Sequence, residues 1–283
     1  MTIALVLIVK NEEETLPILA KSVKGLIDTT IIVDTGSTDN TIAVAKEVFS
    51  SVEIYELPWT NFGTARSQAL SLARGKADWL LMLDADQVVT WHPDLPNWLS
   101  DKSFNGFMIN HNMGGASWYL PRLLAGNQEW KFIGSVHEYL DPEDRQLITL
   151  YADSLSVFNP RDGGSIRGFD KDIELLLPEA ENGCARSRYY LAQSYKDSGD
   201  AISAIESYRI RAFMPDTWEE EAWHASYQAG KLADDPLELL LSWIRRPGRA
   251  EPLQALSEWI ARNKPMEPPA DDVLFIEPNS YNR

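Results

Sequence analysis

The sequence predicts an α/β fold, with a Rossmann-like, mostly parallel sheet in the N-terminal half and a separate helical domain after it. As far as Leu83, continuous apolar runs alternate with segments of helical spacing, which is typical of parallel βαβ units. Beyond residue 165, helical spacing recurs without intervening strands. The chain is therefore expected to contain an α/β domain followed by an all-helical one.

The N-terminal elements follow from the period of the apolar residues. Runs that are apolar on both faces indicate buried parallel strands, and apolar residues three or four positions apart indicate helices. The expected elements are strands over residues 3–9, 30–33, 52–57 and 79–83, and helices over residues 15–27, 38–49 and 64–73. From residue 91 to 158 the pattern changes to short segments separated by Gly, Asn and Pro.

In the second half of the chain, the spacing of the apolar residues predicts helices over residues 170–177, 185–197, 201–212 and 219–232. Five residues fall at the offsets of a tetratricopeptide repeat, namely Leu191, Tyr195, Gly199, Ala204 and Tyr208. We therefore expect three parts: an α/β domain over 1–165, a helical, tetratricopeptide-like domain over 166–263, and a Pro-rich tail over 264–283.

The composition narrows the class of protein. The chain has 283 residues, with 26 Lys plus Arg against 42 Asp plus Glu and a formal net charge of −16. This acidic balance disfavours nucleic acid as a partner, because such binding depends on Lys and Arg at phosphates. The single cysteine, Cys184, cannot form an internal disulfide, and no apolar run reaches the roughly 18 residues of a membrane span. These features predict a cytoplasmic protein without a membrane span.

Carboxylates follow two of the expected strands. Asp34 ends one strand, and Asp84 and Asp86 follow another. Open α/β sheets bind ligands at the carboxyl ends of their strands, and an Asp-x-Asp pair there can hold Mg²⁺ or Mn²⁺ beside a diphosphate. The alternative is structural: Asp84 and Asp86 belong to a solvated turn, and Asp34 to a strand-to-helix turn that Ser37 caps.

Further candidate residues lie on the next helix and beyond it. Arg66 offers a planar donor fork to a phosphate or a base, or else pairs with a surface acid. His137 and Glu138 offer a metal ligand and a general base, although a structural histidine is the alternative. Trp118, Arg122 and Trp130 either line the side of the site where an acceptor binds or pack in the core.

Four segments together resemble the family 2 glycosyltransferases of the GT-A fold. They are Leu7-Ile-Val-Lys-Asn-Glu-Glu, Ile32-Val-Asp-Thr-Gly-Ser-Thr-Asp-Asn-Thr, Ala65-Arg-Ser-Gln-Ala-Leu and Leu83-Asp-Ala-Asp. Two further segments, Gly134-Ser-Val-His-Glu and Arg246-Pro-Gly-Arg-Ala-Glu-Pro-Leu, resemble the branch that carries tetratricopeptide-like repeats. Two positions depart from the family pattern, where Thr35 replaces an Asp and Ser67 replaces an Asn.

The resemblance implies a nucleotide-sugar donor, with a UDP-sugar expected. Asp34 would contact the base, and the backbone around Ile8 and Val9 would line the base pocket. Asp84 would face the nucleotide, and Arg66 would reach the base or the diphosphate.

The resemblance also implies a metal-dependent reaction that inverts the anomeric carbon. Asp86 would coordinate Mn²⁺ or Mg²⁺, with His137 as a further ligand, and Glu138 would be the general base for the acceptor hydroxyl. The acceptor would be a glycan, a peptide or a small molecule. The helical domain could bind an acceptor polypeptide, a docking protein or a second copy of the chain. Binding of a second copy would make the protein a homodimer.

Three other functions remain as alternatives. A sugar nucleotidyltransferase is disfavoured because residues 1–11 contain no glycine for a phosphate-binding loop. A repeat-containing scaffold with an inactive transferase domain is disfavoured by the presence of Asp34, Arg66, Asp84 and Asp86. A glycosyltransferase acting on DNA bases would need a basic groove despite the acidic composition.

Overall fold

The computed structural model describes residues 1–92, 99, 103–141, 147, 149–159, 168–215 and 218–263. Two compact units make up the chain, Met1–Pro178 and Glu179–Arg283, and each is described by itself. The predicted domain boundary at residue 165 and the predicted tail over 264–283 lie outside the described residues.

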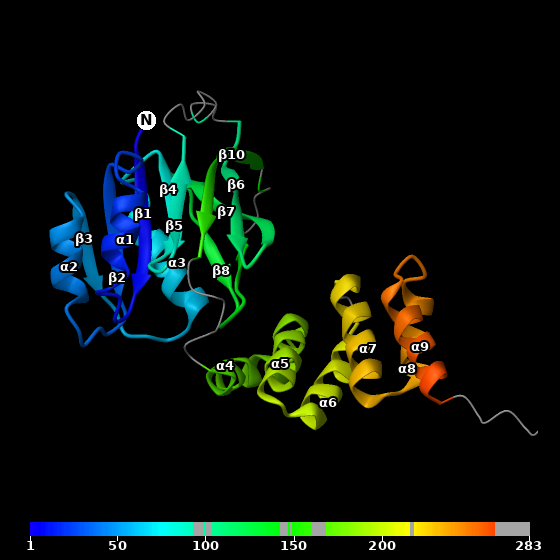
Figure 1. Cartoon of the computed structure of the whole chain (residues 1–283). Coiled ribbons are helices and arrows are strands. Elements are labelled where there is room, and N and C mark those ends of the chain that lie inside the picture. The colour runs from blue at the N-terminus through cyan, green and yellow to red at the C-terminus, as the bar shows by residue number, and fades with distance from the viewer. Residues whose placement is uncertain are drawn as a thin grey trace, which may run out of the picture. The chain divides into compact units, whose positions relative to one another are not determined.

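A mixed, mostly parallel sheet forms the centre of the first unit. In the described part of the chain it has eight strands in the order β3-β2-β1-β4-β7-β6-β10-β5 (Figure 1). Four neighbouring strands of the sheet are parallel, namely β1 (Ile3–Val9), β2 (Thr29–Asp34), β3 (Val52–Glu56) and β4 (Trp79–Asp84). The four strands predicted from apolar runs are confirmed, and so is the α/β fold class.

The remaining strands were not predicted individually. They are β5 (Val88–Trp91), β6 (Gly106–Met113), β7 (Ala116–Ala125) and β10 (Thr149–Phe158). Strand β7 pairs antiparallel with both β4 and β6 and so joins the four neighbouring parallel strands to the rest of the sheet. A separate two-stranded sheet consists of β8 (Lys131–Ile133) and β9 (Tyr139–Asp141).

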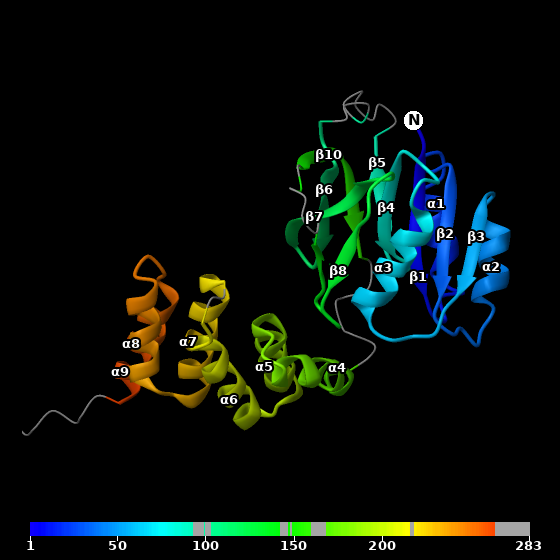
Figure 2. The same cartoon turned by 180° about the vertical axis from the view of Figure 1, so that it is seen from behind.

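Helices cover both faces of the parallel strands. Helices α1 (Leu16–Ser22) and α2 (Thr41–Val48) pack on one face, and α3 (Phe62–Ala73) packs on the other (Figures 1 and 2). Alternate residues of β1 point into the two cores, because successive side chains of a strand point to opposite faces. Helix α1 ends earlier than predicted, and the chain turns at Gly25, whose φ is +83°.

The second unit is helical, as predicted. The described helices in and around it are α4 (Phe169–Glu181), α5 (Ala185–Ser198), α6 (Ala201–Ala212), α7 (Glu219–Ala233), α8 (Pro236–Arg245) and α9 (Glu251–Arg262). From α5 to α9, each helix packs on the next. At two of the tetratricopeptide positions, Gly199 ends α5 in the left-handed conformation and Tyr208 is fully buried.

Within the described residues, none of the helices combines the length and the apolar character needed to cross a membrane.

Candidate active site

The pairing of β1 brings the predicted carboxylates to one edge of the sheet. Val9 pairs with Asp34 of β2, and Ile8 pairs with Asp84 of β4. Because these strands are parallel, their carboxyl ends meet at the same edge. Strand β1 lies between β2 and β4, so the backbone of Ile8 and Val9 at its end lies between the two carboxylates. The side chains of Ile8 and Val9 are buried. The structure therefore places four of the predicted site residues together.

Asp34 is buried and holds the loop that follows β2. Its carboxylate accepts hydrogen bonds from the Gly36 amide at 3.2 Å, from the Ser37 amide at 3.1 Å and from the Ser37 hydroxyl. Thr35, one of the two departures from the family pattern, donates from its hydroxyl to the Val9 carbonyl at 3.1 Å. Ser37 does not cap the helix, because α2 begins at Thr41 and its N-cap is Asn40, so the capping alternative is wrong. Asp34 instead fixes the geometry of the loop that follows β2.

Arg66 is the central cation of the site. It projects from α3 and is buried, with Nη2 2.5 Å from Asp84 Oδ1 and Nε 2.6 Å from Glu138 Oε1. Burial by itself would lower the pKa of Arg66, but the two carboxylates outweigh it and raise that pKa above its usual value. The predicted residues Arg66, Asp84 and Glu138 thus form one ion-paired group, and the surface-pair alternative for Arg66 is wrong.

Arg122 and His111, as well as Arg66, affect the charge state of Asp84. Burial would raise the pKa of Asp84, but the charges of Arg66 and Arg122 outweigh it and lower that pKa. His111 on β6 is buried, and burial together with Arg122 lowers its pKa to about 4, so its imidazole is neutral at pH 7. The rings of His111 and Trp118 are stacked with centroids 6.3 Å apart. His111 lies in none of the quoted motifs, and its place beside Asp84 depends on strand pairing that the sequence pattern does not display.

The ring of Phe132 lies close to the guanidinium groups of both Arg66 and Arg122. The guanidinium carbons of Arg66 and Arg122 lie 5.9 Å and 5.7 Å from the centroid of its ring. Both distances are within the range of a cation–π contact. The buried Nη1 atom of each arginine has no hydrogen-bond partner among the described residues, and Arg66 Nε makes only the ion-pair contact with Glu138. The predicted alternative of core packing holds for Trp130, which is buried and donates to the Ala125 carbonyl at 2.9 Å.

The segment that carries Glu138 is attached to α3 through its backbone. The Phe62 amide donates to the Ser135 carbonyl at 3.0 Å, and the Phe132 amide donates to the Ser67 hydroxyl at 2.9 Å. A Cβ atom on Gly63 would lie 2.3 Å from the Gly134 carbonyl oxygen, so only glycine permits this approach. Ser67, the second departure from the family pattern, is therefore a structural contact between α3 and β8.

The predicted metal ligands lie at the edge of this group. Asp86 is partly exposed, and its Oδ2 accepts from Asn159 Nδ2 at 3.4 Å. His137 is exposed and has a φ of +51°, an uncommon conformation for a residue other than glycine. In the part of the chain that the structure describes, no group of three or more His, Cys, Asp and Glu side chains could hold a metal ion.

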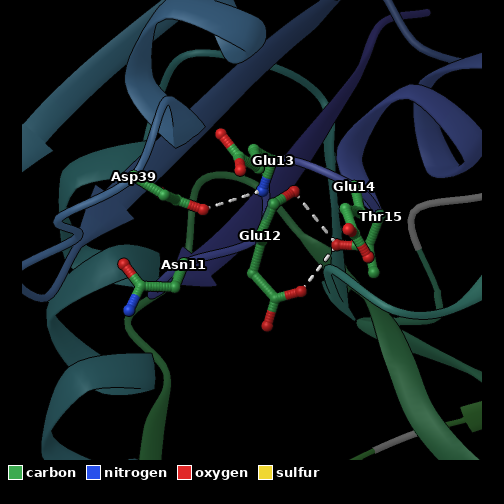
Figure 3. A pocket seen from close by; sticks show the side chains of 6 residues that line it. All are labelled: Asn11, Glu12, Glu13, Glu14, Thr15 and Asp39. Carbon is green, nitrogen blue, oxygen red and sulfur yellow. Dashed lines mark hydrogen bonds between the residues drawn. The ribbon is translucent and has the colours of Figure 1, made fainter.

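An acidic pocket lies between the loops that follow β1 and β2 (Figure 3). Its lining residues are Asn11, Glu12, Glu13, Glu14, Thr15 and Asp39. The two loops are tied together, because the Glu13 amide donates to Asp39 Oδ2 at 3.3 Å and the Asn40 amide donates to Glu13 Oε2 at 2.9 Å. These carboxylates accept backbone hydrogen bonds, so we assign the pocket a structural role at the strand ends.

Residues 4–101 match the family described as Glycosyl transferase family 2. The N-terminal part of the chain is a family 2 glycosyltransferase domain. Asp34, Arg66, Asp84 and Asp86 lie inside the matched range of this domain, whereas His137 and Glu138 lie beyond it. The resemblance inferred from the four N-terminal segments is therefore confirmed.

Two curated relatives match longer parts of the chain. A TPR repeat-containing protein of Synechococcus elongatus is 33% identical over 146 residues, which are 49% of this chain and 35% of the relative. An uncharacterized glycosyltransferase of Rickettsia typhi is 36% identical over 173 residues, which are 60% of this chain and 54% of the relative. The chain thus spans 35% of one relative and 54% of the other.

A solved structure shows the same fold over nearly the whole chain. Residues 1–349 of S. aureus TarS, solved in complex with UDP-GlcNAc, match with a TM-score of 0.52 and 13% identity. The match covers 93% of this chain and 92% of that one. This likeness shows the fold, which is a mixed, mostly parallel α/β sheet followed by a C-terminal helical region.

Proposed function

We propose that this protein is a metal-dependent, inverting glycosyltransferase that moves a sugar from a UDP-sugar to an acceptor hydroxyl. One observation carries the proposal: the buried guanidinium of Arg66 bridges Asp84 and Glu138 at the carboxyl edge of the parallel strands. A charged group buried at this edge is typical of a binding site rather than of a structural core. The family 2 match over residues 4–101 supports the same function.

The donor would bind across the ends of β1, β2 and β4. In this proposal Asp34 reads the base, the backbone of Ile8 and Val9 lines the base pocket, and Asp84 faces the nucleotide. Arg66 would contribute a nitrogen to the base or the diphosphate, and its unpartnered Nη1 atom supports that role. Because Asp34 already accepts hydrogen bonds from its own loop, base reading would require that loop to present the carboxylate to the ligand.

The residues present fit a cation that arrives with the donor. Mg²⁺ is usually held by one or two carboxylates together with substrate phosphates and waters. Asp86 would supply the carboxylate and His137 a further ligand, which is consistent with the absence of a three-residue metal cluster among the described residues. When bound, the cation supplies positive charge to the departing diphosphate. The chain's own contribution is to hold Asp86 at the end of β4.

Glu138 is the proposed general base for the acceptor hydroxyl. Its side chain is 10% exposed and already paired with Arg66, so its position is fixed before any ligand binds. Its second role would be to orient the guanidinium. The acceptor is proposed only as a hydroxyl of a glycan, peptide or small molecule.

Calorimetric titration tests the proposal directly. The purified chain is titrated with UDP, GDP and CDP, each with Mn²⁺ and with a chelator. We expect UDP to bind in the presence of Mn²⁺ at least tenfold more tightly than GDP or CDP, and the chelator to remove most of that binding. Absence of binding by every nucleotide would favour the scaffold alternative.

Two variants sharpen the titration. Asp86→Asn should make the weak residual UDP binding independent of Mn²⁺. The matched control is Asp197→Asn, an exposed position on α5 that pairs with Lys196 at 3.4 Å and should leave binding unchanged. Equal behaviour of the two variants would refute the metal role of Asp86.

A further inference from the structure

Helix α8 exposes a complete apolar stripe. Its members are Leu237, Leu240, Leu241 and Ile244, which are 68%, 37%, 53% and 56% exposed. They lie three or four positions apart, so they share one face of the helix. Leu239 and Ser242, on the opposite side, are buried. The packed side of α8 thus includes a polar residue, and most of its large apolar side chains lie on the exposed face, which we call the α8 stripe.

The α8 stripe lies at the end of the helical stack. Helix α7 packs on α8 and α8 packs on α9, which is the last described helix (Figure 1). Helix α9 also exposes Leu253 and Ile260, by 43% and 49%. Stacked helical repeats need a polar outer face where the stack ends, and large exposed apolar patches usually mark a surface that something covers. Helix α9 has an exposed polar face, made by Glu251, Gln254, Glu258 and Arg262, whereas the exposed face of α8 is apolar.

The chain itself continues from a point next to the stripe. Helix α9 ends beside Asp234, the C-cap of α7, because Trp259 Nε1 donates to the Asp234 carbonyl at 3.0 Å and Arg262 Nη2 lies 2.6 Å from Asp234 Oδ1. Leu237 begins the α8 stripe three residues after Asp234. Arg262, at the end of the described chain, therefore lies near the end of the stripe where Leu237 is found.

We propose that the tail segment Val273-Leu-Phe-Ile276 docks on the α8 stripe and caps the helical stack. This segment is a continuous run of four large apolar residues, set between Asp272 and Glu277. The nine residues from 264 to 272 can span roughly 30 Å when extended. Helix α8 has ten residues and is about 15 Å long, so the segment can reach any part of the stripe.

A second copy of the chain is a weaker candidate for the same surface. Each copy carries a formal net charge of −16, and like net charges repel one another on approach. The tail is covalently attached, so its effective concentration at the stripe is in the millimolar range for a short linker. The test below distinguishes docking of the tail from binding of a second copy or of a foreign protein.

Disulfide trapping in the full chain tests the proposal. The exposed Cys184 is first replaced by serine, and Leu241→Cys is then combined with Phe275→Cys. A disulfide requires Cα atoms within about 7 Å of each other. With oxidised glutathione at low protein concentration, we expect a disulfide within one chain, seen by intact mass and by monomer migration on a non-reducing gel. The control pairs Phe275→Cys with Ile202→Cys on α6, a position that is 82% exposed.

If the tail docks on the α8 stripe, the disulfide in the Leu241→Cys, Phe275→Cys chain should form at least tenfold faster than the disulfide in the control chain. Equal rates for the two pairs would overturn the proposal, since they would indicate a tail without a preferred site. A disulfide formed only between two chains would overturn it in favour of a second copy. No disulfide at all would also overturn it and would leave the stripe to a foreign protein.

Hydrogen exchange gives a second measurement without added cysteines. In the full chain, the double variant Leu274→Asp and Phe275→Asp should speed amide exchange in α8 about tenfold, because the helix loses its cover. Tyr281→Asp, at a tail position outside the apolar run, is the matched control and should leave exchange unchanged. An unaltered α8 in the double variant would refute docking.

Discussion

Arg66 and Glu138 form a buried ion pair, with Nε 2.6 Å from Oε1, although one residue lies on α3 and the other follows the short strand β8. Because the same guanidinium also holds Asp84, the pair connects the second half of the first unit to the end of β4. The segment around Glu138 is thereby part of the same site as the family 2 domain, even though it lies beyond the matched range.

Arg66→Met should destabilise the first unit by about 3 kcal/mol, because it leaves two carboxylates in a buried site without their cation. Arg74→Met, at the residue that follows α3, is the control. Arg74 pairs with Glu129 at the surface, and losing that exposed pair should cost less than about 1 kcal/mol. Urea unfolding of both variants measures the difference, and equal losses would contradict a buried role for Arg66.

Glu138→Gln should lower kcat by about 10²-fold or more, because the amide cannot accept a proton from the acceptor. The amide oxygen can still accept from Arg66, so UDP affinity should change by less than about threefold. Turnover and calorimetry on one preparation separate these effects. A tenfold loss of UDP affinity with normal turnover at saturation would assign Glu138 to orienting Arg66 instead.

Gly63→Ala should destabilise the first unit by about 1–3 kcal/mol, because its Cβ would lie 2.3 Å from the Gly134 carbonyl oxygen. The displaced segment carries Glu138, so activity should fall together with stability. Gly248→Ala, where an added Cβ meets nothing within 4 Å, should be close to neutral. Unfolding and turnover assays test both variants, and a fully active Gly63→Ala protein would show that the close approach is dispensable.

His111 should make stability depend on pH in the acid range. Burial and Arg122 lower its pKa to about 4, whereas an unfolded histidine titrates near 6.5. Between these values the unfolded state binds more protons, so stability should decrease as the pH falls from about 6.5 to about 4. The slope from one group is at most about 1.4 kcal/mol per pH unit.

His111→Gln should flatten that slope, as measured by urea unfolding at several pH values. His92→Gln, at an exposed position, is the control and should leave the slope unchanged. An unaltered slope in His111→Gln would show that the histidine is solvated in solution.

Strands β1, β2 and β4 were predictable because they are buried on both faces. Strand β1 is apolar at every position from Ile3 to Val9, and such a run has a clear start and end. Strands β6 and β7 have a mixed pattern, with polar residues such as His111 among the apolar ones, so their sequences do not identify them as strands. Helices α8 and α9 lie inside the predicted helical domain over 166–263, but their separate ranges were not predicted.

The site was predictable where residues follow a strand in sequence and unpredictable where they meet through packing. Asp34 and Asp84 end strands, and their positions follow directly from the strand order. The contact between Gly63 and Gly134 joins segments far apart in the chain, and a single sequence contains no sign of it. The same is true of Arg122 and His111 beside Asp84.

The burial of Arg66 has a consequence for how a ligand would bind. An arginine side chain on the surface loses about 2 kcal/mol of rotational freedom when it is immobilised. In this chain Arg66 is immobilised by Asp84 and Glu138 when the protein folds. A ligand therefore meets a preorganised guanidinium, and its affinity is not reduced by the entropy of ordering that side chain.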